Sequence, residues 1–296
     1  MNKKLQAHTA VLLANIFFGV NYITIKSIVP LKLSAPALNV SRVVGSSVLF
    51  WLLFLIKPSA PGILKKDIPR FILCAVLGVA LNQALFVKGL SFTSSIHASL
   101  LMLVTPILII FIAAWILKEK LTALKIIGVI TGVAGATLLI LMKDVSHTAS
   151  NIFLGDVLVI LNAVSYAFYL VLVRPLMKRY SAIHVIRWVF TLSLFFMIPY
   201  GWHDSITTQW QNFTTSNWMC FAFVITGATF FAYLFNIYGV EVIGASATGS
   251  YIYTQPVFAA IIAMIFTGEA YDWLKLFAAS LIFSGVYMAN YKPSVS

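Results

Sequence analysis

Polar side chains recur at helical spacing inside the long apolar stretches of this 296-residue sequence. Asn15, Gly19, Tyr22 and Lys26 stand at i, i+4, i+7 and i+11, so on a helix they share one face. Amide and phenol groups bind small polar solutes, whereas the same groups facing lipid would lack hydrogen-bond partners. This face is therefore predicted to point inward, where it either lines a polar cavity or joins neighbouring helices by hydrogen bonds.

Two later segments carry comparable stripes of amides and phenols. One stripe consists of Asn162, Tyr166 and Tyr169, and the other of Thr248, Tyr251 and Gln255. We expect Tyr22, Tyr169 and Gln255 to face a substrate cavity. For Asn82, Gln83, Tyr233 and Asn236, cavity lining and helix packing are equally open.

Basic side chains also interrupt the apolar stretches, at Lys26, Arg42, Lys88 and His97. An Arg or Lys at the middle of a spanning helix costs about 2.5–3.5 kcal/mol to insert, so such positions suggest function. One interpretation is a positive outer vestibule that receives a carboxylate or another anionic group. The alternative is that each chain extends separately to the membrane interface, or that His97 is a hydrogen-bonded packing residue. Arg42 lies deepest and is the strongest candidate for a functional role.

Signals for catalysis are missing from the sequence. It contains no His-Glu-x-x-His motif, no Gly-x-Ser-x-Gly motif and no paired acids, and its two cysteines, Cys74 and Cys220, lie in predicted helices. No metal or other cofactor is expected. No acidic residue occurs between Ala7 and Ile56, so proton/cation exchange through a buried carboxylate in the first helix is not expected.

Composition identifies the elements that must position these residues. The sequence is 61% hydrophobic and 9% charged, whereas soluble domains carry about 25% charged residues. A helix needs about 20 apolar residues to cross the bilayer. Ten segments qualify: 8–29, 37–56, 70–89, 94–117, 123–142, 154–173, 182–201, 218–238, 248–266 and 272–291. The prediction is an all-α integral membrane protein with ten transmembrane helices and no extramembrane catalytic domain.

The net charge of +12 follows the predicted topology and does not indicate nucleic-acid binding. Lys and Arg concentrate in alternate connections, as in the segments 57–70, 118–125 and 174–187, and near both ends of the chain. This is the bias that marks cytoplasmic loops. It predicts a multi-pass membrane protein with both termini in the cytoplasm.

The second half of the sequence repeats the first. At an offset of 150, Pro106 matches Pro256, and several Gly, Ala, Glu and Lys positions match in the same order. We therefore predict two five-helix repeats, 1–145 and 146–296. Because five is odd, the repeats must be inverted, which is typical of secondary transporters. Pro106 and Pro256 are predicted to kink their helices, either as hinges beside a cavity or as bends in packing helices.

These motifs together resemble the EamA-type branch of the drug/metabolite transporter superfamily. The resemblance extends over essentially the whole chain. The residues that carry it are Phe18-Gly19-Val20-Asn21-Tyr22 through Lys26, Arg42, Gly89 through Ser94, Thr105-Pro106, Lys118 through Leu121, Gly128 through Gly135, and Leu154-Gly155-Asp156. Phe18 stands where that branch usually has Trp. The resemblance implies a plasma-membrane carrier of amino acids or related metabolites, often exported.

The expected function is alternating-access transport, or facilitated diffusion, of a small polar solute. Within carriers, sugar nucleotides or organic phosphates remain the alternative substrates. A passive channel and an intramembrane enzyme on lipid-linked substrates are the competing classes.

Gly128, Gly132 and Ala136 form a small-residue ridge that packs within a monomer or forms a homodimer seam.

Overall fold

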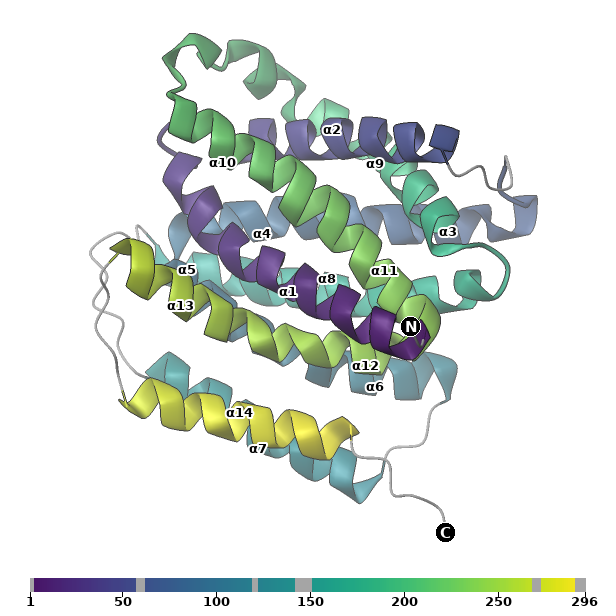
Figure 1. Cartoon of the computed structure of the whole chain (residues 1–296), viewed down its shortest axis with the longest axis vertical. Coiled ribbons are helices and arrows are strands. Elements are labelled where there is room, and N and C mark those ends of the chain that lie inside the picture. The colour runs from purple at the N-terminus through teal and green to yellow at the C-terminus, as the bar shows by residue number, and fades with distance from the viewer. Residues whose placement is uncertain (1–2, 57–61, 119–121, 142–150, 268–272, 291–296) are drawn as a thin grey trace.

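The computed structural model describes residues 3–56, 62–118, 122–141, 151–267 and 273–290, and within these ranges the regular structure is entirely helical (Figure 1). The helices of the first half are α1 (Lys3–Ile28), α2 (Ala35–Ile56), α3 (Ile68–Ala75), α4 (Leu81–Phe92), α5 (Ser95–Leu101), α6 (Thr105–Leu117) and α7 (Ala123–Leu141). Those of the second half are α8 (Ile152–Val173), α9 (Ala182–Thr207), α10 (Thr215–Ile225), α11 (Ala232–Ile243), α12 (Ala245–Ser250), α13 (Gln255–Thr267) and α14 (Trp273–Asn290).

Short turns of other helical types connect several of these elements. The 3-10 turns are η1 (Lys65–Asp67), η3 (Met102–Val104), η4 (Arg174–Lys178), η5 (Trp210–Asn212) and η7 (Tyr251–Thr254). The wider π-helical turns are η2 (Val76–Ala80), between α3 and α4, and η6 (Thr226–Phe231), between α10 and α11. Turns of the π type occur frequently at functional sites.

Seven helical segments within the described ranges are long and apolar enough to cross a membrane. They are Lys3–Ile28, Ala35–Ile56, Lys65–Phe92, Ala98–Ile116, Ile152–Lys178, Ala182–Thr207 and Thr215–Ile243. Of the predicted segments, 123–142, 248–266 and 272–291 correspond to α7, to α12 with α13, and to α14, and parts of these segments lie outside the described residues or side chains. Many spanning helices are longer than predicted, because polar residues continue a helix beyond the hydrocarbon core.

Helix starts follow ordinary capping chemistry. Asn151 Oδ1 accepts a hydrogen bond from the Leu154 amide at the start of α8, and Thr214 forms a reciprocal capping box with Asn217 at the start of α10. Gly244 has a φ of 88° between α11 and α12, a conformation that suits glycine. These local signals set where each helix begins and where the chain turns.

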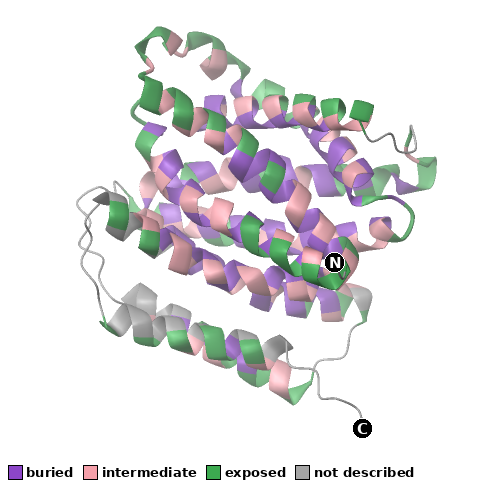
Figure 2. Ribbon diagram, viewed as in Figure 1, coloured by how far each residue is buried: buried purple, intermediate pink, exposed green. Residues whose placement is uncertain are grey.

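Helices of one half of the chain pack mainly against helices of the other half. The closest pairings are α7 with α14, α2 with α9, α1 with α11, and α4 with α8. In Figure 1, α7 and α14 lie side by side at one edge, and α2 and α9 lie toward the opposite edge. Figure 2 shows buried residues concentrated on the central helices, with exposed residues on the outward faces.

Candidate functional site: a polar cavity between helices

A small cavity of about 50 Å³ lies between helices of both halves. A water molecule needs about 10–15 Å³ on the same measure, so the cavity admits a few waters in this conformation. The lining residues are Phe18, Asn21, Tyr22, Arg42, Asn82, Gln83, Phe86, Met102, Asn162, Tyr166, Tyr233 and Gln255. Amides and phenols dominate this set, so the cavity offers hydrogen bonds on an aromatic frame.

One wall of the cavity is a chain of hydrogen bonds between α1 and α13. The Tyr22 hydroxyl donates to Gln255 Oε1 at 3.2 Å, and Gln255 Nε2 donates to Asn15 Oδ1 at 2.7 Å. Asn15 Nδ2 donates in turn to the Val11 carbonyl at 2.7 Å. Asn15 therefore supports the cavity from behind Gln255, while Tyr22 and Gln255 line it.

A second part of the wall joins α4, α8 and α11. Asn162 Nδ2 donates to the Asn82 carbonyl at 2.8 Å, and Asn82 Nδ2 returns a weaker bond to the Asn162 carbonyl at 3.4 Å. The Tyr233 hydroxyl lies within hydrogen-bonding distance of the Gly78 carbonyl in η2, 3.1 Å away, and of Asn82 Oδ1, 3.2 Å away. Tyr233 thus connects the cavity directly to the π-helical turn of the other half.

Arg42 is the charged residue of the cavity. Its side chain is buried, with 3% of its surface exposed. Its Nε donates to Thr229 Oγ1 at 2.9 Å, and Thr229 Oγ1 donates to the Val224 carbonyl at 2.6 Å. Arg42 Nη1 is buried without a hydrogen-bond partner. Because Thr229 belongs to η6, Arg42 of the first half contacts the π-helical turn of the second.

Aromatic rings frame these polar groups. Phe18 meets Tyr233 edge to face with ring centroids 6.1 Å apart, and Tyr22 meets Phe86 edge to face at 5.2 Å. Such geometries are the preferred ones for aromatic pairs. The rings give the cavity apolar surface beside its amides.

Five residues predicted from the sequence as cavity residues meet in this lining, namely Tyr22, Arg42, Asn82, Tyr166 and Gln255. Tyr169 is instead buried against Gly78, where a Cβ atom on that glycine would overlap its ring. Tyr251 lies outside the lining, and its hydroxyl is 2.8 Å from His8 Nδ1. Lys26 is partly exposed and does not line the cavity. The side chain of His97 lies outside the described residues.

Pro106 and Pro256 are the second residues of α6 and α13, and each follows a 3-10 turn, η3 or η7. A proline ring clashes with the carbonyl four residues earlier, which here belongs to the preceding 3-10 turn. The prolines therefore account for the interruption of regular α-helix at η3 and η7. Thr105 and Gln255, which precede the prolines, are both buried, and Gln255 reaches the cavity. The two prolines thus occupy matching places beside the site.

Asn21, Phe86 and Met102 line the cavity although they belong to none of the predicted stripes. Asn21 directly precedes Tyr22, and Phe86 follows Asn82 by four residues. That spacing places Phe86 on the face of Asn82 and could have indicated it. Met102 belongs to a 3-10 turn, for which a 3.6-residue period is no guide.

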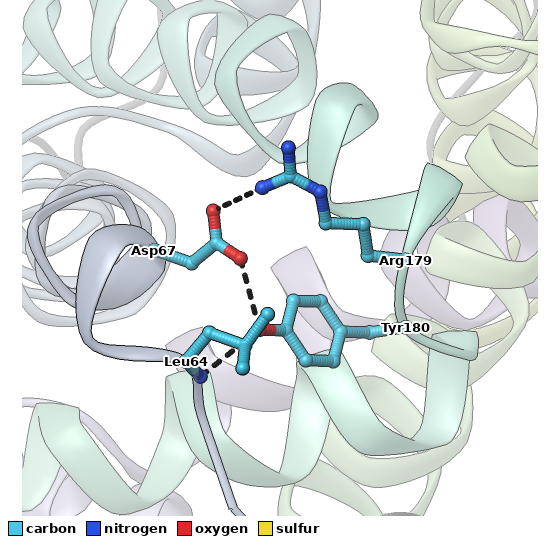
Figure 3. A network of polar contacts seen from close by, with 4 residues as sticks. All are labelled: Leu64, Asp67, Arg179 and Tyr180. Atoms are coloured by element: carbon cyan, nitrogen blue, oxygen red, sulfur yellow. Dashed lines mark hydrogen bonds and ion pairs between the residues drawn. The ribbon is translucent and has the colours of Figure 1, made fainter.

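A second polar cluster lies at one end of the bundle (Figure 3). Asp67 Oδ1 accepts from Arg179 Nη1 at 2.7 Å, and its Oδ2 accepts from the Tyr180 hydroxyl at 2.9 Å. Tyr180 Oη also accepts from the Leu64 amide at 3.1 Å. Burial, and the hydrogen bond to the Asp67 carboxylate, raise the pKa of Tyr180, so the phenol stays protonated as a donor. This cluster joins the start of the α3 segment to the connection before α9.

Comparison with known proteins identifies the family. Residues 5–141 and 153–291 each match the family model described as the EamA-like transporter family. The chain belongs to this family. As an EamA-like transporter of the drug/metabolite type, with several long apolar helices, it is a multi-pass membrane protein.

Two of three relatives of this EamA-like protein carry names that describe a transporter or an exporter. The uncharacterized transporter YetK of Bacillus subtilis is 22% identical over 250 residues, which cover 84% of this chain and 76% of the relative. A "probable terminal-alkyne amino-acid exporter" of Streptantibioticus cattleyicolor is 25% identical over 228 residues, 76% of this chain and 74% of the relative. The protein WALLS ARE THIN 1 of Arabidopsis thaliana is 24% identical over 329 residues, covering 99% and 84%.

A solved crystal structure shares the fold of this EamA-like chain. The two superpose with a TM-score of 0.72 over 97% of this chain and 96% of the other, at 17% identity.

Within the described residues, no group of three or more His, Cys, Asp or Glu side chains is arranged to hold a metal ion.

Proposed function

We propose that this EamA-like protein is a secondary carrier of small polar metabolites, amino acids or related compounds, that works by alternating access around the central cavity. The observation that carries the proposal is a cavity of buried amides, phenols and one guanidinium, built from helices of both halves. Polar and charged groups are costly inside the membrane and mark substrate pathways. The amino-acid exporter among the relatives supports this substrate class.

We further propose ten spanning helices in two inverted repeats, 1–145 and 146–296. The packing pattern supports this arrangement because it is reciprocal. The first predicted span, α1, packs against α11 of the eighth, and the sixth span, α8, packs against α4 of the third. Likewise α1 packs against α13, and α8 against α6. The two π-helical turns begin 150 residues apart, at Val76 and Thr226, which agrees with the offset of the sequence repeat.

Alternating access requires the helices around this cavity to separate. A cavity that holds a few waters does not admit a metabolite, so the conformation described is closed around its centre. The turns η2 and η6 interrupt regular α-helix beside the lining residues Asn82 and Tyr233. In our proposal these turns absorb the bending that opens the cavity toward one side and then the other.

The excess of Lys and Arg in alternate connections supports placing both termini in the cytoplasm, and the family resemblance supports placing the protein in the plasma (inner) membrane. We expect the small-residue ridge of Gly128 and Gly132 to serve packing with α14, because a Cβ on Gly285 would overlap the backbone at both positions. This favours a functional monomer, with a homodimer as the alternative.

Reconstituted vesicles test the carrier function. We expect purified protein to exchange labelled amino acids across the membrane faster when unlabelled substrate is present on the opposite side, as a carrier does. Flux should saturate with concentration. Flux that is absent for every metabolite tested, or that scales linearly with concentration like that of a channel, would contradict the proposal.

A further inference from the structure

We infer that the cavity recognises a single carboxylate through Arg42, so that the transported solutes are monocarboxylates whose ammonium group is dispensable. This inference rests on the proposed carrier function and specifies its substrate class. It depends on the charge balance of the cavity and on the polar atoms that have no partner there.

The Arg42 guanidinium is a fixed positive charge in a buried place, because arginine is not deprotonated in proteins. Thr229 holds it through Nε, which leaves Nη1 buried and unpartnered beside the cavity. An isolated buried charge costs several kcal/mol unless a counter-charge and hydrogen bonds compensate it. Binding of an anion would compensate the buried positive charge of Arg42 and offset this cost.

The protein does not provide that anion among its described residues. The acidic side chains within the described ranges are Asp67, Asp156, Asp204 and Glu241. Asp67 pairs with Arg179, Asp204 lies 2.5 Å from Ser34 Oγ, and Glu241 is exposed. None of the four lines the cavity. Among the described residues no carboxylate offsets the charge of Arg42, and in this inference the solute supplies the counter-charge.

The amount of positive charge favours a carboxylate over a phosphate. Among the described side chains, Arg42 is the one basic residue in the lining, since Lys26 and Lys88 lie outside it. A carboxylate carries a single negative charge and can accept two parallel bonds from a guanidinium. A phosphate monoester carries about −1.5 to −2 at neutral pH and would remain partly uncompensated. Sugar nucleotides and organic phosphates thus fit this cavity poorly.

The unpartnered acceptor atoms of the lining do not require an ammonium group. Asn21 Oδ1, Gln83 Oε1 and Asn162 Oδ1 are buried without hydrogen-bond partners, and all three residues line the cavity. Amide oxygens accept equally from N–H and O–H donors. A hydroxyl on the solute would satisfy them as an ammonium would, while Phe18, Phe86 and Met102 provide apolar contact for the rest of the solute.

Matched sets of three solutes test this inference in reconstituted vesicles. Each set contains an α-amino acid, the amine that lacks its carboxylate, and the 2-hydroxy acid that lacks its ammonium group, with the side chains of valine, leucine and phenylalanine. We expect saturable exchange of the amino acids and the hydroxy acids at rates within about fivefold of each other. The amines should move no faster than through protein-free vesicles.

Variants of Arg42 test whether this residue causes the preference for solutes that carry a carboxylate. Arg42→Gln should reduce exchange of both acids at least tenfold, and Arg42→Lys, which keeps the charge without the fork, should retain an intermediate rate. The matched control is Arg70→Gln, an identical change at an exposed position of α3 outside the lining, which should exchange at the wild-type rate. Thermal unfolding of each purified variant identifies any that fail to fold, and the solute series on the wild-type protein stands without them.

The outcomes separate the two proposals. Exchange of amines and acids alike, or full exchange of acids by folded Arg42→Gln, overturns the carboxylate inference and leaves the carrier function in place. Exchange of phosphate monoesters in preference to the acids also overturns it. Absence of exchange for every solute contradicts the carrier function, and the carboxylate inference falls with it.

Discussion

The Tyr22 hydroxyl and Gln255 Oε1 are joined by a 3.2 Å hydrogen bond that connects α1 to the first residue of α13. Gln255 Nε2 makes a second bond to Asn15 on the same face of α1. The side-chain amide of Gln255 therefore binds two positions of α1 that are two turns apart. Gln255 itself lies between η7 and Pro256. Any separation of α13 from α1 must break both bonds, so this contact belongs to the closed conformation.

Replacing Gln255 with Leu should therefore destabilise the fold more than replacing Tyr22 with Phe. The first change leaves the Tyr22 hydroxyl and Asn15 Oδ1 without these partners, at a cost of about 1–3 kcal/mol. The second leaves one buried group, Gln255 Oε1, without this partner in place of two, so it should cost less. Unfolding of detergent-solubilised protein measures both free energies. The reverse ranking would show that the amide does not bridge the helices.

The close approach of η2 to α8 gives a steric prediction. A Cβ on Gly78 would overlap ring atoms of Tyr169, which is buried and cannot swing aside. Gly78→Ala should lower the free energy of unfolding by about 1–3 kcal/mol, the range typical of overpacking. Gly132→Ala is the control, because its Cβ would lie 3.4 Å from the nearest atom, Tyr253 Oη, which is an ordinary contact.

Combining Gly78→Ala with Tyr169→Leu extends this test. If the ring is what the new methyl group meets, the two changes together should cost less than the sum of their separate costs. Thermal or denaturant unfolding of the four proteins provides the comparison. Strict additivity would mean that Gly78 is needed for its backbone conformation in the π-helical turn and not for close packing.

Helical periodicity in the sequence was sufficient to find much of this cavity. Tyr22 and Tyr166 lie on inward faces because amides and phenols recur there every three or four residues. The same rule misplaced Tyr251 relative to Gln255, because residues 251–254 form a 3-10 turn. Three residues per turn rotate Tyr251 away from the direction that an α-helix would give it.

Other parts of the site depend on contacts between distant segments, which spacing along one helix does not contain. The sequence predicts that Tyr169 faces the cavity as Tyr22 does, but its ring packs against Gly78 and lies outside the lining. The contact between Arg42 and Thr229 joins residues 187 positions apart. The π-helical turn that presents Thr229 has no distinctive sequence signal among its apolar neighbours.

The cluster around Asp67 should contribute to stability mainly through Tyr180 and less through its ion pair. Arg179 is half exposed, with 50% of its side chain accessible, so water screens its bond to Asp67. Tyr180 is buried and serves both Asp67 Oδ2 and the Leu64 amide (Figure 3). Tyr180→Phe should therefore lower the unfolding temperature more than Arg179→Gln does. An equal or larger loss for Arg179→Gln would assign the stabilisation to the ion pair.

Thr229 should orient the Arg42 guanidinium through the hydrogen bond that its hydroxyl accepts. Thr229→Val keeps the shape of the side chain but removes the acceptor for Arg42 Nε and the donor to the Val224 carbonyl. The guanidinium would then turn among several orientations, so we expect the KM for monocarboxylate exchange to rise several-fold, with a smaller change in maximal rate. Thr229→Ser retains the hydroxyl and should restore a KM close to that of the wild type. If the valine and serine variants exchange carboxylates with equal KM, then η6 does not orient the guanidinium, and Arg42 is held by the rest of its buried surroundings.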